Sequence, residues 1–372
     1  MPLCSKHDQS TGSWHKLAAP VPMPPALCAS PSGNVKQCSV GNCRTFADRY
    51  EWRPATCQLV PWDVAAFCSR LGGRTMLWIG DSTMDEAARV VAAFAGWGDV
   101  GCAKQVQSAT SDTLGRAKYG AGGRGPSWPS YVRESRADVV VLTAGAHIHG
   151  DGNFEKVLQA VADERARHFP ELPLIWKTSS PGGCAAQPLS ELPDAAWWRA
   201  YSERNGYAGG GDSNQPRYVP TGGIFNNGTY NWREFQRRDA YARRFWAEHN
   251  GSVLDLSPLH YRADAHVGGA DCLHMCLRAL SLVPRLLLHL LVTAPAALGA
   301  AGGVLRAPAN AHRGAAPTRP TREVVRPRPS QAQQATPVAA SGGGDSATIT
   351  RCAAIRDLHR RRACVAQGSR PA

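Results

Sequence analysis

The stretch Thr75-Met-Leu-Trp-Ile-Gly-Asp-Ser82 is a short apolar run that ends in a glycine turn. An alanine- and valine-rich helical segment, 86–94, follows it. A short apolar run that leads through a turn into a helix is typical of a buried strand in a parallel sheet. Gly80, Asp81 and Ser82 would then lie at the carboxyl end of that strand, where backbone N–H groups at the start of the helix can stabilise an anion.

Further segments repeat this pattern along the chain. Strands are predicted at 138–142, 172–178 and 252–256, and helices at 154–169 and 233–249. This alternation predicts an α/β fold, with a parallel sheet flanked by helices on both faces. Functional residues of such sheets gather beyond the carboxyl ends of the strands, so Ser82 and the turns at 143–147 and 179–183 are expected to meet there.

The chain is expected to divide into three parts. Residues 1–70 are rich in cysteine, proline and glycine and predict a segment packed on the core; 71–300 form the main domain. Residues 301–372 predict a disordered tail, because they hold few bulky apolar residues. Of the formal net charge of +13, the tail carries +9, from 12 arginines and three acidic residues. No aromatic residues lie between these arginines, which favours a solvated tail over a nucleic-acid-binding one.

Twelve cysteines at irregular spacings predict disulfides and an oxidising compartment. The sequons at Asn227 and Asn250 agree with a secretory or extracellular location. The first ten residues contain no signal-like region, so either a leader precedes this sequence or the cysteines are reduced and the compartment differs. Membrane attachment is expected only through an anchor preceding this sequence. The apolar stretch 286–305 contains a proline and several glycines, which favours a core helix over a membrane span.

A serine nucleophile needs a base and a group that orients the base. Asp271 and His274 are three residues apart, so in a turn or a first helical turn their side chains would share a face. They are the predicted acid and base for Ser82. A zinc site in Cys272-Leu-His-Met-Cys276 is the alternative, although the spacing suits tetrahedral coordination poorly.

Other polar residues are expected near the same cleft. Gly145 and His147 follow the second strand and would line it, together with His149. A His-x-His pair can bind a metal, but on a loop it more often contacts solvent or substrate, so no metal is assigned. Trp197, Trp198 and Trp232 would serve either as a sugar-stacking platform or in core packing.

Four segments together resemble the trichome-birefringence-like branch of the PC-esterase family, within the SGNH/GDSL hydrolases. They are Tyr50-Glu-Trp-Arg-Pro-Ala-Thr-Cys57, Ile79-Gly-Asp-Ser82, Trp176-Lys-Thr-Ser-Ser-Pro181 and the stretch from Arg262 to Leu277. The resemblance extends over about residues 4 to 292, and the last segment is the most specific.

The resemblance implies an SGNH-like sheet and a Golgi-lumen enzyme that transfers acetyl groups to hydroxyls of cell-wall polysaccharide. It gives Ser82 the role of nucleophile, His274 that of base and Asp271 that of orienting acid. The implied partner is a carbohydrate acceptor, with an acetyl donor as co-substrate and no bound cofactor. Nucleic acid is not an implied partner.

The chain departs from the family pattern near the site. Asp85 and Glu86 stand where relatives have Arg and Asn or Gln. Thr143 replaces an Asn that is an oxyanion donor in relatives, and it is expected at the oxyanion site, where its hydroxyl would donate less reliably than the amide. Three alternatives therefore stay open beside the transferase: a carbohydrate acetylesterase with the same residues, a non-catalytic carbohydrate-binding relative, and a metal-dependent hydrolase centred on His147, His149 and His274.

Overall fold

The computed structural model describes residues 1–5, 8–28, 38, 43, 48–98, 101–120, 125–180, 234–262, 265–268 and 271–299, with the backbone alone at 236, 261, 268, 271 and 272. The described residues all belong to one compact unit, Met1–Arg306. The predicted disordered tail at 301–372, Asn227 and the predicted tryptophan platform lie outside the described residues.

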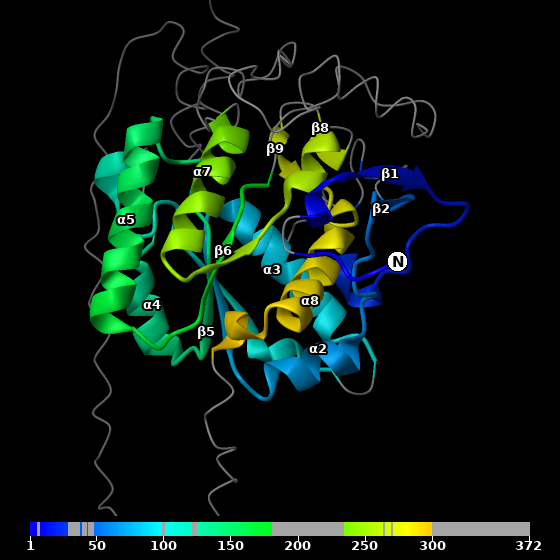
Figure 1. Cartoon of the computed structure of the whole chain (residues 1–372), viewed down its shortest axis with the longest axis horizontal. Helices are drawn as coiled ribbons and strands as arrows, with labels where there is room; N and C mark the ends of the chain where they lie inside the picture. The colour runs from blue at the N-terminus through cyan, green and yellow to red at the C-terminus, as the bar shows by residue number, and fades with distance from the viewer. Residues whose placement is uncertain are drawn as a thin grey trace, which may run out of the picture. The chain divides into compact units, whose positions relative to one another are not determined.

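A five-stranded parallel sheet forms the centre of this unit, as the alternating pattern predicts (Figure 1). Its spatial order is β4-β3-β5-β6-β7, with every neighbouring pair parallel. The strands are β3 (Met76–Gly80), β4 (Val106–Thr110), β5 (Val139–Leu142), β6 (Leu174–Lys177) and β7 (Ser252–Leu254). The connection order reverses between β3 and β5, and ligands of open α/β sheets bind beside such a reversal, beyond the carboxyl ends of the strands. Ser82 lies just after β3, separated from it by Asp81 alone.

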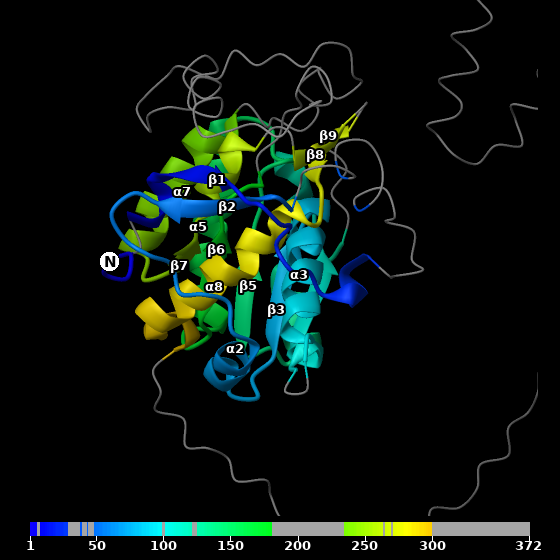
Figure 2. The same ribbon diagram turned by 90° about the vertical axis from the view of Figure 1, so that its right-hand side faces the viewer.

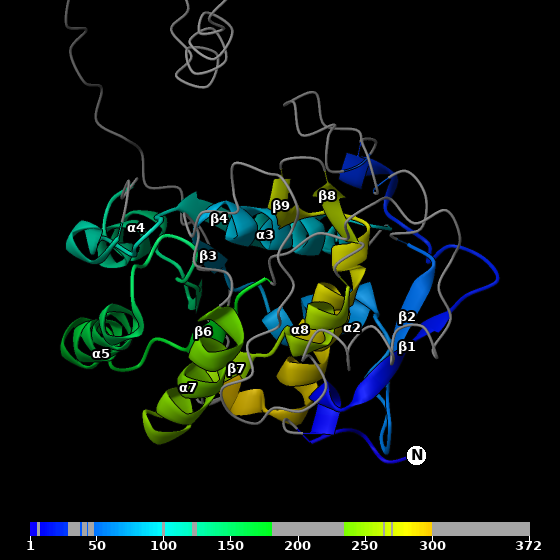
Figure 3. The ribbon, with the colours of Figure 1, turned by 90° about the horizontal axis from the view of Figure 1, so that it is seen from above.

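Alternate residues of each strand enter two separate cores, as the period of two in a strand requires. In β3, Met76 and Trp78 join one core, which contains α2 (Val64–Leu71), α3 (Ser82–Ala95) and α8 (Leu282–Thr293). Leu77 and Ile79 join the other, which contains α4 (Trp128–Ser135), α5 (Asp151–His168) and α7 (Phe235–Glu248). Figure 3 shows these two groups of helices on opposite faces of the sheet.

Two features differ from the sequence-based expectation. Helix α3 begins at Ser82, four residues before the predicted start, because Asp81 caps it. Strand β4 was not predicted, since its sequence, Val106-Gln-Ser-Ala-Thr110, holds no apolar run. An edge strand has only one neighbour, so its exposed positions remain polar.

The N-terminal segment packs on the α8 side of the sheet (Figure 2). Strands β1 (Gly12–Lys16) and β2 (Tyr50–Pro54) pair antiparallel. The guanidinium of Arg262 lies over the rings of both Trp14 and Tyr50, at 4.8 and 4.6 Å from their centroids. Cation–π contacts of this kind are strongest where water is excluded, and Arg262 is fully buried. The contact joins the N-terminal strands to the segment before β8.

Four disulfides connect the described cysteines: Cys4–Cys57, Cys28–Cys38, Cys43–Cys276 and Cys68–Cys102. Three of them staple residues within the first 102 positions, whereas Cys43–Cys276 closes a separation of 233 residues. Disulfides persist in oxidising compartments, so these pairs indicate a secretory or extracellular environment.

Of the apolar stretch 286–305, predicted as a core helix, residues 286–293 lie in α8 (Leu282–Thr293), which is buried along most of its length and is followed by the 3-10 turn Pro295–Leu298. Residues 300–305 lie outside the described part of the chain. Across the residues that the structure describes, no helix combines the length and apolarity needed to span a bilayer.

A buried histidine on α8 connects this helix to the N-terminal segment. Nδ1 of His289 accepts a hydrogen bond from Val60 N at 3.2 Å, and Nε2 lies 3.0 Å from Cys4 O. A ring that accepts at Nδ1 and donates at Nε2 is neutral. Desolvation by burial lowers the pKa of His289, although the hydrogen bond to Cys4 O opposes this shift.

The lowered pKa of His289 predicts that the difference in unfolding free energy between the wild type and His289→Leu depends on pH. A histidine whose pKa is lower in the folded state holds fewer protons there, so its contribution is present near neutral pH and declines as the pH falls below 6.5. We expect His289→Leu to lose about 1–3 kcal/mol of unfolding free energy at pH 7.5, and this gap to narrow by pH 5. Chemical denaturation at both pH values measures it. The exposed His168, changed to Gln, is the control; a gap that is equal at both pH values contradicts the prediction.

Candidate active site

Ser82 is held at the start of α3 by a tight turn. The Asp81 carboxylate accepts hydrogen bonds from Thr83 N (3.0 Å) and Thr83 Oγ1 (2.7 Å). A Cβ at Gly80 would lie 2.6 Å from Cγ2 of Thr143, so only glycine fits there. Gly80 and Asp81, both predicted as site residues, therefore shape the turn. Asp81 is buried and caps the helix, so it is not exposed for substrate contact.

The imidazole of His274 meets this serine. Its Nε2 lies 2.8 Å from Ser82 Oγ, although the two residues are 192 positions apart. His274 belongs to β9 (Asp271–Met275), which pairs antiparallel with β8 (His266–Gly268). Both partners are part-buried. The distance is within hydrogen-bond reach, as a serine nucleophile and its base require.

The backbone around His274 differs from the prediction. A turn or first helical turn was expected to place Asp271 and His274 on one face, whereas the segment is a β-strand. In a regular strand, residues three positions apart point to opposite faces. The prediction that a helical turn places Asp271 and His274 on one face is therefore wrong. The side chain of Asp271 lies outside what the structure describes, and its role stays a prediction.

The hairpin β8–β9 is anchored on both sides of His274. The side chain of Leu273 is buried against Ala146 and Phe235. The side chain of Met275 is buried in the core that contains α2, α3 and α8. Directly after β9, Cys276 is bonded to Cys43, and its N–H donates to Ala265 O at 2.7 Å. These contacts hold the imidazole in register with Ser82. Because Cys276 is in the disulfide, the sulfur is not available to the alternative zinc site.

Ser82 N–H is a backbone donor that could face an oxyanion. At the start of α3, Thr83 N donates to Asp81 Oδ1, and Met84 N and Asp85 N donate to Asp81 O. Ser82 N–H has no hydrogen-bond partner among the described residues. It lies at a helix N-terminus, where the macrodipole favours negative charge.

Thr143 does not supply a second donor here. Its buried hydroxyl donates to Lys177 O at 2.9 Å. A hydroxyl has a single proton, so the expected oxyanion role of Thr143 does not match this arrangement. The hydrogen bond instead joins the ends of β5 and β6.

The loop after β5 carries the other predicted residues. Gly145 packs closely, since a Cβ there would lie 3.0 Å from Ser179 Oγ. Arg238 of α7 is buried and donates to Gly145 O and Ile148 O at 3.1 and 3.0 Å. Nε2 of His147 lies 3.8 Å from the buried carboxylate of Asp112, after β4. This loop is therefore tied to α7 and to the end of β4.

His149 is exposed, and its backbone N–H donates to Tyr119 O. Within the part of the chain that the structure describes, no group of three or more His, Cys, Asp or Glu side chains is arranged to hold a metal ion.

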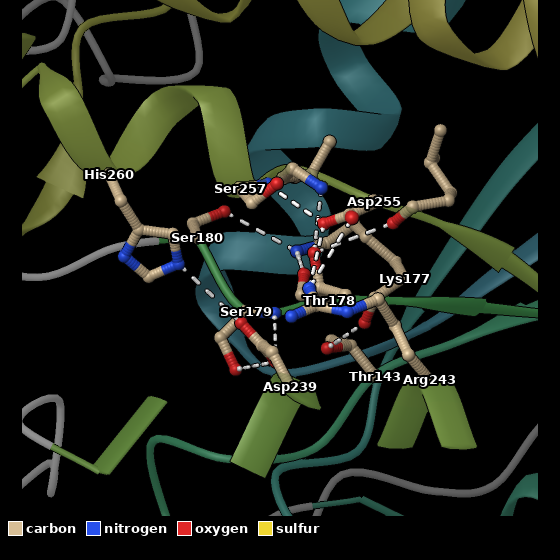
Figure 4. Close-up of polar contacts among 12 residues, drawn as sticks. Thr143, Lys177, Thr178, Ser179, Ser180, Asp239, Arg243, Asp255, Ser257 and His260 are labelled. Carbon is tan, nitrogen blue, oxygen red and sulfur yellow. Dashed lines mark hydrogen bonds and ion pairs between the residues drawn. The ribbon is translucent and has the colours of Figure 1, made fainter. Parts of the chain in front are cut away.

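A buried polar network lies at the ends of β6 and β7 (Figure 4). Oδ1 of Asp239 accepts from Ser179 N and Ser179 Oγ at 2.9 and 3.1 Å, and Oδ2 lies 3.6 Å from His260 Nε2. A catalytic triad places the imidazole between the hydroxyl and the carboxylate. Here the carboxylate lies in the middle, so this set of residues joins α7 to β6 and does not activate Ser179.

Lys177, in the same network, was not among the predicted site residues. Its side chain is fully buried at the end of β6, and Nζ donates to Thr178 O at 3.0 Å and to Ser180 Oγ at 3.3 Å. Desolvation by burial lowers the pKa of Lys177 to about 8, despite the attraction of Asp81, Asp239 and Glu86. A lysine directly after the apolar run Leu174-Ile-Trp176 was the available signal, because lysines are rarely buried without partners.

The lowered pKa of Lys177 predicts that the unfolding free energy rises at alkaline pH. Its pKa is lower in the folded state than the ordinary 10.5, so the unfolded chain holds more protons between pH 8 and 10.5 and folding becomes more favourable across that window. Relative to Lys177→Met, the unfolding free energy of the wild type should increase by on the order of 2 kcal/mol. Denaturation at pH 7, 8, 9 and 10 measures this, with the exposed Lys104→Met as control. A constant difference would contradict the prediction.

Comparison with protein-family models and with curated proteins finds no match to this chain.

Proposed function

We propose that this chain is a serine-dependent polysaccharide O-acetyltransferase of SGNH type, related to the trichome-birefringence-like proteins. The observation that carries the proposal is the 2.8 Å hydrogen bond between His274 Nε2 and Ser82 Oγ. The partially buried position at the carboxyl edge of a parallel sheet supports it, because such edges are the usual place for active sites in α/β folds.

In the first half of the reaction, the neutral imidazole of His274 accepts the Ser82 proton at Nε2 while Oγ attacks the carbonyl carbon of an acyl donor. Negative charge then develops on the carbonyl oxygen, where Ser82 N–H and the start of α3 stabilise it. The intermediate collapses when His274 returns the proton to the leaving group, which leaves an acyl group on Ser82.

In the second half, an acceptor hydroxyl gives its proton to His274 Nε2 and attacks the acyl-serine. The second intermediate collapses, His274 protonates Ser82 Oγ, and the acyl group is now on the acceptor. Throughout, an acid such as Asp271 would stabilise the imidazolium, as the family resemblance implies.

Two other functions use the same residues. The same residues form an acetylesterase if water reaches the acyl-serine before a sugar hydroxyl does. A non-catalytic carbohydrate-binding protein is favoured by the Thr143 hydroxyl, since its bond to Lys177 O leaves one donor fewer for an oxyanion. Removing one such donor costs on the order of a hundredfold in turnover.

The proposed setting is the Golgi lumen or another part of the secretory pathway. The four disulfides support an oxidising compartment. The acceptor is proposed to be a cell-wall-type polysaccharide, by resemblance to the family.

The nucleophile can be tested with a fluorophosphonate probe, which reacts with activated serines. Wild-type protein should be labelled, whereas Ser82→Ala should not be, and His274→Gln should be labelled at least about a thousandfold more slowly, because the base is lost. Ser108→Ala, at an exposed serine on β4, is the matched control and should be labelled like wild type. Equal labelling of wild type and Ser82→Ala would overturn the proposed nucleophile, and labelling of neither would favour the binding protein.

Acceptor choice can be tested with an acetyl donor and xylan oligomers. A transferase should raise the mass of the oligomers by whole acetyl groups, and Ser82→Ala should abolish this change. Free acetate with unmodified oligomers would instead assign the chain as an esterase.

A further inference from the structure

Glu86 lies on the same face of α3 as Ser82. The two residues are four positions apart in a helix that begins at Ser82, and residues at this spacing are neighbours on the helix surface. The Glu86 side chain is 2 % exposed. A carboxylate removed from water at this depth needs hydrogen bonds or a cation to offset its lost hydration.

Its hydrogen bond reaches the strand that carries the base. Oε2 of Glu86 accepts from the backbone N–H of Met275 at 3.3 Å, and Met275 directly follows His274 in β9. The helix with the nucleophile and the strand with the imidazole are thus joined twice: by the Ser82–His274 hydrogen bond and, one turn along α3, by Glu86.

The surrounding charges fit a carboxylate at this position. Lys177 of β6 interacts electrostatically with Glu86, with Asp81 at the start of α3 and with Asp239 of α7. From β9, His274 is the titratable group with a described side chain that faces this region. Asp85, the neighbour of Glu86 on α3, faces away and pairs with Arg89 and Ser108.

We infer that Glu86 is a positioning residue that holds His274 against Ser82 and stabilises its protonated form. This inference rests on the proposed function of the Ser82–His274 pair. The mechanism has two parts: the hydrogen bond fixes the backbone of β9, and the negative charge favours the imidazolium that forms when Ser82 loses its proton.

The charge is tested by the pKa of His274, which needs no substrate. Its ring resonance is assigned in full-length protein by comparison with His274→Gln, and titrated by NMR in wild type and in Glu86→Gln. The glutamine keeps an acceptor for Met275 N and removes the charge. We expect the pKa of His274 to fall by at least about half a unit, because a nearby opposite charge is lost. Asp85→Asn is the matched control, since Asp85 is part-exposed and already paired with Arg89, and it should leave the titration unchanged.

The hydrogen bond between Glu86 and Met275 N is tested by the rate of fluorophosphonate labelling at Ser82. Glu86→Leu removes both the charge and the acceptor, so labelling should slow by about a hundredfold or more, and Glu86→Gln should restore part of this loss. Thermal unfolding of each variant identifies the temperature range in which all are folded, and labelling is compared within it.

The outcomes separate this inference from the proposed function. An unchanged His274 pKa in Glu86→Gln, or labelling of Glu86→Leu at the wild-type rate, would overturn the role of Glu86. Absence of Ser82 labelling in wild type would overturn the proposed function instead, and the titration of His274 would still decide whether Glu86 acts on the imidazole. If Glu86→Leu does not fold, the titration in Glu86→Gln decides alone.

Discussion

A side-chain hydrogen bond between Ser82 and His274 is the contact on which the functional interpretation depends. It joins residues 192 positions apart, and neither can approach the other by local folding. The serine is presented by a strand–turn–helix unit of the sheet, and the imidazole by a two-stranded hairpin outside the sheet. A displacement of either element by a few ångströms would break this hydrogen bond. The geometry of the site therefore depends on how the hairpin is fixed to the sheet.

Several covalent and polar contacts supply that precision. The Cys43–Cys276 disulfide links the end of β9 to the N-terminal segment, and Arg262, before β8, stacks between Trp14 and Tyr50. His289 joins the same N-terminal segment to α8. The cysteine-rich N-terminal residues therefore form part of the support of the site. An oxidising compartment would be needed to maintain this support, because the disulfide cannot persist under reducing conditions.

The buried charges near Ser82 are also balanced by residues from separate elements. Lys177, Asp81, Asp239 and Glu86 come from β6, the β3–α3 turn, α7 and α3, and lie close enough to interact electrostatically. Buried charges are tolerated only when they are paired and hydrogen-bonded. Glu86 thus has structural partners within the same protein. Thr143 likewise bonds to the backbone of β6 through its hydroxyl, so the hydroxyl proton is engaged there.

The sequence alone determined the class of fold and singled out Ser82 and His274 as a possible pair. Apolar runs of strand length that alternate with helical segments are enough to predict a parallel sheet, because buried parallel strands cannot alternate polar and apolar residues. Gly80-Asp-Ser82 and the Asp271-Cys-Leu-His274 segment were recognisable by residue type. Tertiary structure decided what local patterns cannot encode. The polar edge strand β4 is held by its pairing with β3, the segment at His274 is a strand through its pairing with β8, and Glu86 and Lys177 acquire their roles only because the chain brings together helix and strands that are far apart in sequence.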